Sequence, residues 1–291
     1  MSSPPAEHWA KARSFHHSRF SAERIAADRR QSVSVCLPAR ECAGTVGQIV
    51  AELAILRELG VIDEIVVVDA ASADGTAAVA ERAGAVVWQE AELMPSYGPV
   101  LGKGDAMWRG LSALGGEIVC FLDADTECFS AHFVIGLLGP LVSEPSVSFV
   151  KAFYRRPLAE TGAPAEGGGR VNHLMARPAL ELFYPELAGV RQPLAGEVAA
   201  RRDLLDQLPF ATGYGVEIAM LIDVWRTLGL DGMAQVDLDE HRNRHQSLSA
   251  LTPMAATVLS TIAQRMRREG RLRGVEGELV ERPPLASVAV P

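Results

Sequence analysis

Residues Glu117–Asp125 read EIVCFLDAD, an apolar run that ends in two carboxylates. The apolar part predicts a buried strand. Two similar runs precede it, VSVCL at Val33–Leu37 and EIVVVD at Glu64–Asp69, and each is followed by a segment of helical character. Strands that alternate with helices imply right-handed crossovers and a mostly parallel sheet. The sequence therefore predicts an α/β fold.

The flanking segments continue this alternation. In the first half, the pattern predicts a helix over Val46–Leu56, a strand within Gly84–Gln89, a helix within Gly102–Leu114 and a strand within Ser146–Phe153. In the second half, it predicts helices at about Val171–Phe183, Glu197–Gln207 and Val216–Leu228, a short strand at Met233–Asp237 and a last helix at about Pro253–Glu269. We expect residues 1–31 to form a polar N-terminal arm, residues 155–169 a Gly- and Pro-rich mobile loop, and residues 271–291 a flexible tail.

Composition excludes several classes of protein. The 291 residues are 48% hydrophobic and 22% charged, which is ordinary globular usage. A net charge of −8 argues against a general nucleic-acid binder. We expect no transmembrane segment, because no apolar run approaches the roughly 20 residues that cross a bilayer. The four cysteines form no CxxC pair, so we expect free thiols and a cytoplasmic protein.

Polar side chains stand where the predicted strands end. In a parallel sheet, ligands bind beyond the carboxyl ends of the strands. Five residues gather along that edge: Arg40, Asp69, Ser72, Asp123 and Asp125. The pair Asp123 and Asp125 suits a divalent cation, which offsets the mutual repulsion of the carboxylates. Such a D-x-D also occurs at ordinary turns, so the motif alone leaves both readings open.

Two glycine-rich segments offer anion sites. Gly102-Lys103-Gly104 places a lysine at a helix start, although the phosphate-loop motif is incomplete and a solvated lysine is the simpler reading. Gly167-Gly168-Gly169-Arg170 precedes another helix, where amides and a guanidinium hold anions, with a flexible linker as the alternative. No G-x-G-x-x-G follows the first strand, which counts against a dinucleotide oxidoreductase.

The second half adds an imidazole, amides and a carboxylate. His241-Arg242-Asn243-Arg244-His245 is a polar cluster that could complete a cation site or hold phosphate, or could be a solvated loop. Glu217 begins an otherwise apolar helix, where a carboxylate is favoured by the helix dipole or accepts hydrogen bonds from sugar hydroxyls.

These motifs, in this order, resemble the retaining glucosyl-3-phosphoglycerate synthases and the related mannosyl-3-phosphoglycerate synthases of actinobacteria. The resemblance covers roughly residues 32–269 and rests on LPAR, VVDAASADGT, GKGDAMWR, FLDAD, VKAFYRRPL, GGGRV, RQPLAGE, GYGVEI and AQVDL followed by HRNR. It implies a GT-A fold, with a nucleotide-sugar-binding half at 32–154 and a helical acceptor-binding half at 170–270. It further implies hexose transfer to the 2-hydroxyl of 3-phosphoglycerate with Mg²⁺ or Mn²⁺, by a homodimer. UDP-glucose is the expected donor and GDP-mannose the alternative.

The resemblance also implies roles for individual residues. Nucleotide and diphosphate would be held by Pro38, Ala39, Arg40, Asp69, Ser72 and Lys103. Asp125 and His241 would bind the metal, with Asp123 close to the donor, while Leu194, Ala195 and Glu217 would line the hexose site. The acceptor would contact Gly169, Arg170, Asn172 and Asn243. The catalytic set would be Asp123, Lys103 and Glu217. The chain departs from the family at Cys42, where an acidic residue is usual, and at Asn172, where threonine is frequent.

The expected chemistry is α-retaining transfer without an enzyme nucleophile, driven by positioning and electrostatic stabilisation. Two other classes share the nucleotide-binding fold. A sugar nucleotidyltransferase would carry a glycine-rich loop with Arg and Lys after the first strand, which LPARECAGT (Leu37–Thr45) lacks. A non-catalytic sugar-nucleotide sensor would bind the donor and release no nucleoside diphosphate.

Overall fold

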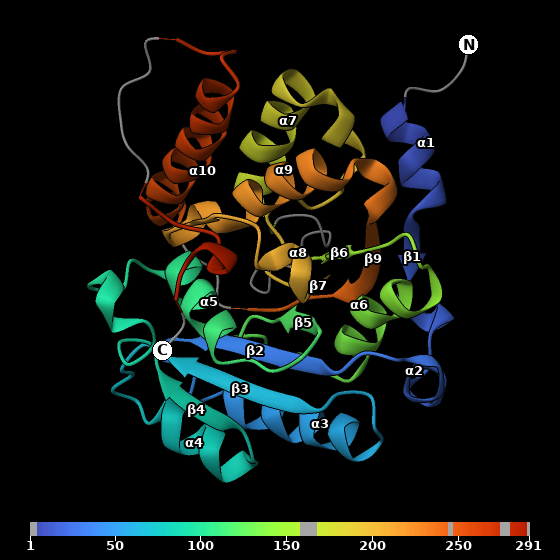
Figure 1. Cartoon of the computed structure of the whole chain (residues 1–291), viewed down its shortest axis with the longest axis vertical. Helices are drawn as coiled ribbons and strands as arrows, with labels where there is room; N and C mark the ends of the chain where they lie inside the picture. The colour runs from blue at the N-terminus through green and yellow to red at the C-terminus, as the bar shows by residue number, and fades with distance from the viewer. Residues whose placement is uncertain (1–4, 158–167, 244–246, 274–279, 290–291) are drawn as a thin grey trace.

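The computed structural model describes residues 5–157, 168–243, 247–273 and 280–289. Within these residues an eight-stranded mixed sheet runs in the order β1-β9-β6-β7-β5-β2-β3-β4 (Figure 1). Its strands are β1 (Ser14–His16), β2 (Val33–Ala39), β3 (Glu64–Asp69), β4 (Val86–Gln89), β5 (Ile118–Phe121), β6 (Phe149–Arg155), β7 (Val198–Arg201) and β9 (Met233–Glu240). A separate pair consists of β8 (Phe210–Ala211) and β10 (Glu281–Arg282). The predicted α/β fold with a mostly parallel sheet is confirmed, since only β7 runs antiparallel to its neighbours in the large sheet.

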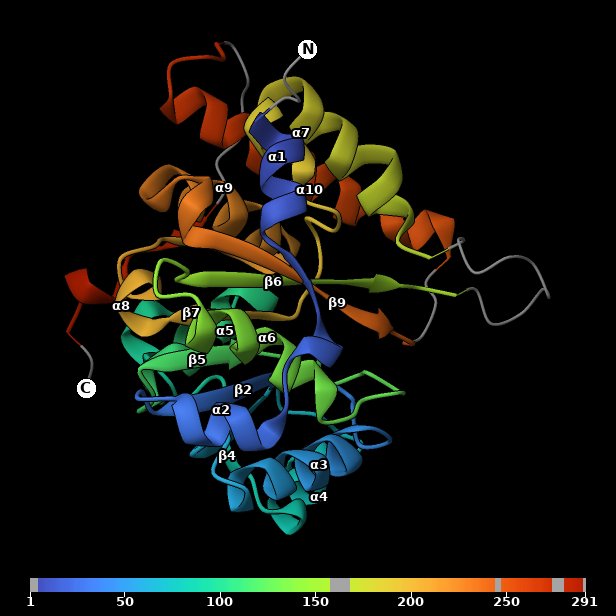
Figure 2. The same ribbon diagram turned by 90° about the vertical axis from the view of Figure 1, so that its right-hand side faces the viewer.

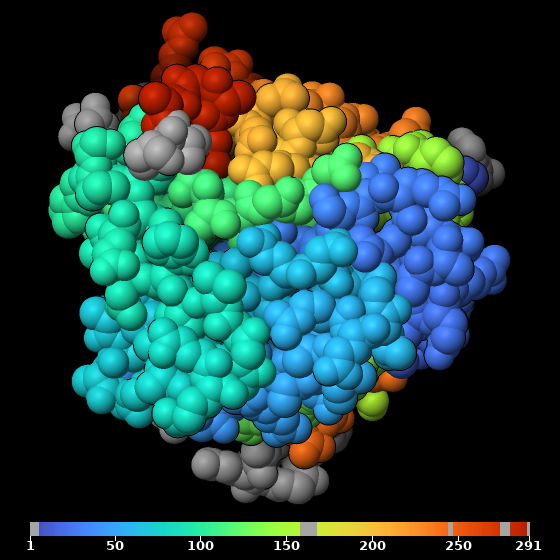
Figure 3. Space-filling view, turned by 60° about the horizontal axis from the view of Figure 1, so that its bottom comes forward, coloured from blue at the N-terminus to red at the C-terminus, as the bar shows by residue number. Residues whose placement is uncertain are grey.

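Helices cover both faces of the sheet. They are α1 (Pro5–Ala12), α2 (Ala22–Asp28), α3 (Val46–Glu58), α4 (Thr76–Ala83), α5 (Lys103–Ser112), α6 (His132–Ser143), α7 (Arg177–Phe183), α8 (Arg202–Leu205), α9 (Val216–Leu228) and α10 (Leu248–Arg268). Val35 and Leu37 of β2 pack into a core with α3 and α6, whereas Cys36 packs into the opposite core with α5 and α9. This alternation of side chains is the reason that β2 is apolar throughout. In the space-filling view of Figure 3, α3 and α4 form the surface over one face.

The segment Glu197–Gln207 was predicted as a helix, and that prediction is wrong. Residues 198–201 form β7, which pairs antiparallel with β5 and β6 in the middle of the sheet, and only the short helix α8 follows. Ala199 and Ala200 are fully buried, in opposite cores. Alanine favours helices in isolation, but a fully buried site between two strands outweighs that propensity.

The N-terminal arm is part of the fold rather than a loose lead-in. β1 adds to the sheet edge by parallel pairing with β9, with Phe15 opposite Val236. The side chain of Trp9 is 5% exposed, and its indole nitrogen donates a 2.8 Å hydrogen bond to the carbonyl of Leu230. Figure 2 shows this segment, in blue, descending past the sheet edge to α2. Because its apolar side chains are scattered among charged ones, no periodicity revealed them.

The described part of the expected flexible tail is packed as well. Arg282 of β10 donates two 2.6 Å hydrogen bonds to the buried carboxylate of Asp105, in α5. The indole of Trp108 donates to the carbonyl of Pro283 at 2.7 Å. A buried carboxylate needs such a cation, and the sequence gives no local sign of this pairing. Most of the predicted mobile loop, residues 158–167, lies outside the described residues.

Two further expectations concern the cysteines and the membrane. All four cysteines are free; Cys36, Cys42 and Cys120 are buried and Cys128 is partly so. Among the described residues, no helix combines the length and the apolar character that crossing a bilayer requires.

Candidate active site

A cavity of about 490 Å³ lies beyond the carboxyl ends of β2 and β5 and extends to α9 and α10. Short β5 ends at Phe121, so both carboxylates of the D-x-D lie past the strand, at the cavity. Twelve predicted site residues line the cavity: Pro38, Ala39, Arg40, Lys103, Asp123, Asp125, Gly169, Arg170, Asn172, Leu194, Glu217 and Asn243. Asp69, Ser72, Ala195 and His241 are not among its lining residues. Arg244 and His245 lie in the segment 244–246, outside the described residues.

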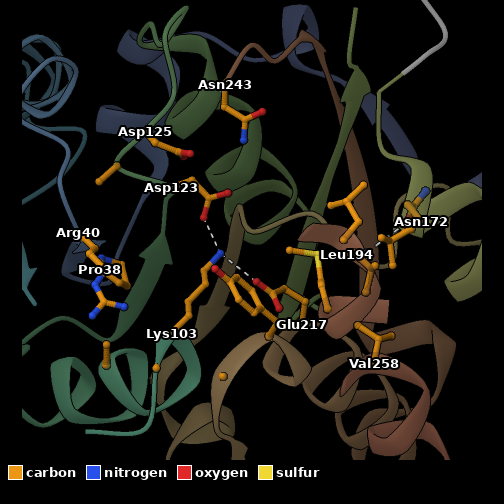
Figure 4. A pocket seen from close by; sticks show the side chains of 18 of the residues that line it. Pro38, Arg40, Lys103, Asp123, Asp125, Asn172, Leu194, Glu217, Asn243 and Val258 are labelled. Carbon is orange, nitrogen blue, oxygen red and sulfur yellow. Dashed lines mark hydrogen bonds and ion pairs between the residues drawn. The ribbon is translucent and has the colours of Figure 1, made fainter. Parts of the chain in front are cut away.

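Lys103, the first residue of α5, connects the two halves of this cavity. Its Nζ lies 2.6 Å from Oδ1 of Asp123 and 2.9 Å from Oε1 of Glu217 (Figure 4). Burial lowers the pKa of Lys103, but the two carboxylates outweigh that effect and hold the pKa well above its ordinary value. Gly104 allows the start of α5 to pack closely against the backbone of Ala211, because a Cβ at this position would lie 1.9 Å from the carbonyl oxygen of Ala211. The lysine is therefore a fixed cation of the site.

Behind the carboxylates lies a buried imidazole. His241 is 1% exposed, and its Nε2 lies 2.9 Å from Oε1 of Glu197 and 3.1 Å from the hydroxyl of Thr126. The ring of Tyr154 stacks on it at 4.5 Å, while the Tyr154 hydroxyl donates to Oε2 of Glu197 at 2.7 Å. Burial would raise the pKa of Glu197, but the charge and hydrogen bond of His241 prevail and lower it. The imidazole is thus held in one orientation beside the carboxylates.

Four groups here could hold a cation. Ligand atoms of Asp123, Glu197 and His241 all lie within 4.8 Å of one another. Asp125 lines the adjoining cavity, and burial and then the charge of Asp123 raise its pKa, partly offset by Lys103 and His241. Nδ1 of His241 is buried and has no hydrogen-bond partner among the described residues. Carboxylate oxygens with one imidazole fit Mg²⁺ or Mn²⁺. The sequence pointed to Asp125 and His241 but missed Glu197, the closest partner of His241.

A second missed residue is Lys151, in the middle of β6. Its ammonium is buried and donates a 2.7 Å hydrogen bond to the carbonyl of Ala195. That carbonyl belongs to the turn between Leu194, which lines the cavity, and β7. Gly196 in the same turn lets Asp123 approach, since a Cβ would lie 2.4 Å from its carboxylate. A lysine inside the apolar run SFVKAF was the available sequence signal. Ala195 thus supports the cavity wall at Leu194 from behind, through its backbone.

The part of the cavity wall that contains Arg170 and Asn172 includes the start of a π-helix, Asn172–Ala176. Asn172 is 3% exposed; its side-chain oxygen accepts a 3.4 Å hydrogen bond from the backbone of Leu194, and its Nδ2 has no described partner. Gly169 has a φ of +70°, a conformation that glycine adopts without strain, directly before Arg170. Such π-helical turns are frequent at functional sites. The amide and guanidinium offer donors to an anion, as does Asn243 across the cavity (Figure 4).

The side chains of Asp69 and Ser72 form hydrogen bonds with other residues of the protein and do not line the cavity. Oδ2 of Asp69 accepts hydrogen bonds from the Ser72 amide at 3.1 Å and from Gln89 at 3.2 Å. The Ser72 hydroxyl accepts from the Glu41 amide at 2.9 Å. Oδ1 of Asp69 is buried without a described partner. These bonds hold the loop after β3 against the loop after β2, next to Ala39 and Ala70 in the cavity wall.

The sheet topology and the carboxylate–lysine site at its edge define a glycosyltransferase of the GT-A class. Residues 34–169 match the family model described as Glycosyl transferase family 2. The chain is 40% identical over 267 residues to the glucosyl-3-phosphoglycerate synthase of Petrotoga mobilis, a match that covers 89% of this chain and 82% of that protein.

Two solved structures are also similar. The mannosyl-3-phosphoglycerate synthase from Rubrobacter xylanophilus matches with a TM-score of 0.91 and 45% identity, over 98% of each chain. The glucosyl-3-phosphoglycerate synthase from Mycobacterium tuberculosis, in complex with Mn²⁺, UDP-glucose and phosphoglyceric acid, matches with a TM-score of 0.79 and 38% identity, over 91% of this chain and 93% of that one. The chain belongs to the glucosyl-3-phosphoglycerate synthase family.

Proposed function

We propose that the protein transfers glucose from UDP-glucose to the 2-hydroxyl of 3-phosphoglycerate, with retention of configuration and with a divalent cation. The observation that carries the proposal is one continuous cavity with two chemically different ends. Lys103, Asp123 and Asp125 line the first, and Asn172, which lies away from Asp125 in Figure 4, lines the second together with Arg170. A nucleotide diphosphate with its cation suits the first end, and a phosphorylated acid suits the second. The Mycobacterium tuberculosis relative, crystallised with Mn²⁺, UDP-glucose and phosphoglyceric acid, supports this pairing.

The donor would lie along the edge of β2 and β3. Pro38, Ala39 and Arg40 would contact the nucleotide directly, since they line the cavity. Asp69 and Ser72 would support it from the loop behind. The metal would be held by Asp125 and His241 together with the neighbouring carboxylates. When bound, the cation offsets negative charge on the donor's diphosphate.

The protein's own groups then act by position and charge. Lys103 would neutralise the departing diphosphate, while Leu194, the Ala195 turn and Glu217 would hold the hexose. Arg170, Asn172 and Asn243 would orient the acceptor through its phosphate, so that its hydroxyl approaches the face from which the diphosphate leaves. The acceptor proton would pass to the departing phosphate. No side chain is required as a covalent nucleophile.

The deciding experiment is an assay of the purified protein with 3-phosphoglycerate against a panel of nucleotide sugars. We expect UDP-glucose to be the preferred donor and glucosyl-3-phosphoglycerate to be the product. Arg170→Ala should raise the KM for 3-phosphoglycerate and leave the KM for the donor nearly unchanged. Binding of the donor without release of nucleoside diphosphate would contradict the proposal and favour a sensor. Release of pyrophosphate from a nucleoside triphosphate would favour a nucleotidyltransferase.

A second candidate is transfer of mannose from GDP-mannose to the same acceptor. The high similarity to the Rubrobacter xylanophilus mannosyl-3-phosphoglycerate synthase over nearly the whole chain favours it. The same donor panel separates the two candidates, because the donors differ in the base and in one hydroxyl configuration.

We also propose that the protein is a cytoplasmic homodimer. Its free, buried thiols suit a reducing compartment. Leu174 and Leu182, on the helical stretch formed by the π-helix and α7, are 77% and 72% exposed and would be covered by a second copy. Light scattering coupled to size-exclusion chromatography tests the dimer, and Leu182→Glu should shift it to the monomer.

A further inference from the structure

A second cluster of metal-ligating side chains lies at the sheet edge formed by β1 and β9. Nε2 of His16 lies 3.2 Å from Oδ1 of Asp239, and Nε2 of His17 lies 2.7 Å from Oδ2 of the same carboxylate. The three ligand atoms lie within 4.8 Å of one another. We propose that His16, His17 and Asp239 form a second metal site, for a transition-metal ion of the zinc type, separate from the cation site of the transferase.

The composition of the cluster sets the class of metal. Two imidazoles and one carboxylate match the donors that Zn²⁺ accepts, and imidazole suits Zn²⁺, Ni²⁺ and Cu²⁺ better than Mg²⁺. The side chains of His16 and Asp239 are 44% and 51% exposed, so water can complete the coordination. This donor set differs from the carboxylate-rich site in the cavity, where hard cations are favoured.

The backbone of β9 is shaped to present the carboxylate. Asp239 has a φ of +65°, a left-handed conformation that non-glycine residues rarely adopt. It lies at an irregularity in the β6–β9 pairing, where the register shifts between Phe153 and Arg155. Its amide donates a 3.0 Å hydrogen bond to the side chain of Asp237. Such irregular, strained positions in strands often re-aim a side chain toward a site.

Neighbouring groups hold the imidazoles in place. Nδ1 of His16 accepts a 3.2 Å hydrogen bond from the Ser18 amide and lies 2.8 Å from the Ser18 hydroxyl, and these contacts hold the ring with Nε2 beside Asp239. For Nε2 to bind a metal, the ring proton must lie on Nδ1, where the Ser18 hydroxyl can accept it in place of the amide contact. The ring of His17 packs between those of His16 and His132, with centroids 4.5 and 4.4 Å away. Both nitrogens of His132 are already engaged, with the hydroxyl of Ser130 and the carbonyl of Leu238, so His132 supports the cluster and is not a ligand.

A metal here would fasten the N-terminal segment to the sheet. His16 ends β1, His17 begins the following 3₁₀ turn, and Asp239 lies near the end of β9. The ion would therefore crosslink segments more than 200 residues apart in the sequence, as the 222-residue separation of His17 and Asp239 shows. Because it binds only the folded arrangement, it should stabilise the protein by linkage.

The test uses the full-length protein, stripped of metal by dialysis against a chelator. Zn²⁺ is titrated against a chromophoric zinc indicator, and Co²⁺ binding is followed by visible absorption. We expect the wild type to bind one more equivalent of Zn²⁺ than the double variant His16→Ala/His17→Ala. His8→Ala, an exposed histidine outside the cluster, is the matched control and should bind as the wild type does.

Two milder variants keep the test independent of folding. Asp239→Asn removes the anionic ligand and should also lose this equivalent. Ser18→Ala should weaken the same site about 10–100-fold, as loss of a supporting hydrogen bond to a metal-bound histidine does. Added Zn²⁺ should raise the melting temperature of the wild type and of His8→Ala but not that of Asp239→Asn. Equal zinc stoichiometry in wild type, double variant and Asp239→Asn would overturn the proposal.

Discussion

Nζ of Lys103 lies 2.6 Å from Oδ1 of Asp123, although the two residues follow different strands of the sheet. Glu217 approaches the same ammonium at 2.9 Å, from α9. Without a donor, the carboxylates share the lysine between them. A diphosphate would offer Lys103 a new partner, and Asp123 and Glu217 would then be available to a divalent cation or to hydroxyl groups of the ligand. The arrangement is therefore preorganised for a ligand that carries both charges.

Replacing Lys103 by Met should remove this fixed cation. We expect kcat/KM for the nucleotide-sugar donor to fall at least about 10²-fold. Loss of one preorganised hydrogen-bond donor in other active sites has an effect of this size. The measurement is steady-state kinetics at saturating acceptor. Lys11→Met, at an exposed lysine of α1, is the control and should keep wild-type activity. Equal losses in both variants would remove Lys103 from the reaction.

The metal should be required, and its binding should depend on pH in a defined direction. Burial and the charge of Asp123 raise the pKa of Asp125, so its carboxylate takes up a proton at a higher pH than an ordinary aspartate. Since a metal ligand must be deprotonated, Mn²⁺ affinity should fall as the pH is lowered through that raised pKa.

Calorimetric titration of Mn²⁺ at several pH values measures this effect. Asp125→Asn should abolish metal binding in the cavity together with turnover, whereas Asp231→Asn, at an exposed aspartate, should leave both unchanged. Asp123→Asn removes one cause of the shift, so the acid limb of its remaining Mn²⁺ affinity should move to lower pH. Full activity of the wild type in excess chelator would contradict the metal requirement.

Local pattern predicted the frame of the molecule well. β3 occupies the predicted Glu64–Asp69, because it is an apolar run bounded by polar residues. α9 occupies the predicted Val216–Leu228, because its apolar residues recur at helical spacing and a glycine follows it. β7 was missed because its alanines carry no strand signal of their own. It becomes a strand only through its place between β5 and β6, which a sequence window does not contain.

The site residues also fall into those that the sequence indicates and those that only the complete fold brings together. The carboxylates Asp123 and Asp125 stand at a strand end, so sequence reasoning placed them at the edge of the sheet, whereas Lys103 was assigned to the diphosphate by resemblance. His241 was assigned to the cation by resemblance, and its buried partner Glu197 was not anticipated at all. The pairing of Arg282 with Asp105 spans 177 residues, and neither residue has a neighbour in the sequence that indicates it. Long-range polar contacts of this kind depend on the complete fold.

Lys151 should make the stability of the protein depend on alkaline pH. Burial lowers the pKa of Lys151 to about 8, against an ordinary value of 10.5, while Glu217 and Glu197 partly oppose the shift. Between these two pH values the unfolded chain binds a proton that the folded chain has released. Lys151 should therefore make the free energy of unfolding rise with pH in this range, by up to about 1.4 kcal/mol per pH unit.

Urea denaturation of wild type and Lys151→Met from pH 7.5 to 10 measures this contribution as the difference between the two pH dependences. The variant should lose it. It should also lose the hydrogen bond that holds the Ala195 turn, so kcat/KM should fall about tenfold, as for a buried bond worth roughly 1–1.5 kcal/mol. Parallel pH dependences of stability in the two proteins would show that Lys151 keeps an ordinary pKa.

The C-terminal segment should be needed for both stability and activity, because Arg282 joins it to α5 and to the loop that precedes Lys103. Besides Asp105, Arg282 donates to the carbonyls of Tyr97 at 2.7 Å and Pro99 at 3.1 Å. Arg282→Met would leave the buried carboxylate of Asp105 with Arg109 as its remaining cation, at 3.1 Å. Breaking a buried ion pair costs about 3–5 kcal/mol, and the remaining arginine should keep the loss near the lower value.

The measurement is the urea midpoint, followed by donor kinetics at a temperature where both proteins are folded. We expect kcat/KM to fall as well, since Lys103 is then held by a looser loop. Arg273→Met, at an exposed arginine of the same C-terminal region, is the control and should change stability by less than about 0.5 kcal/mol. If Arg282→Met is as stable and as active as Arg273→Met, the C-terminal segment merely rests on the surface and does not organise the active site.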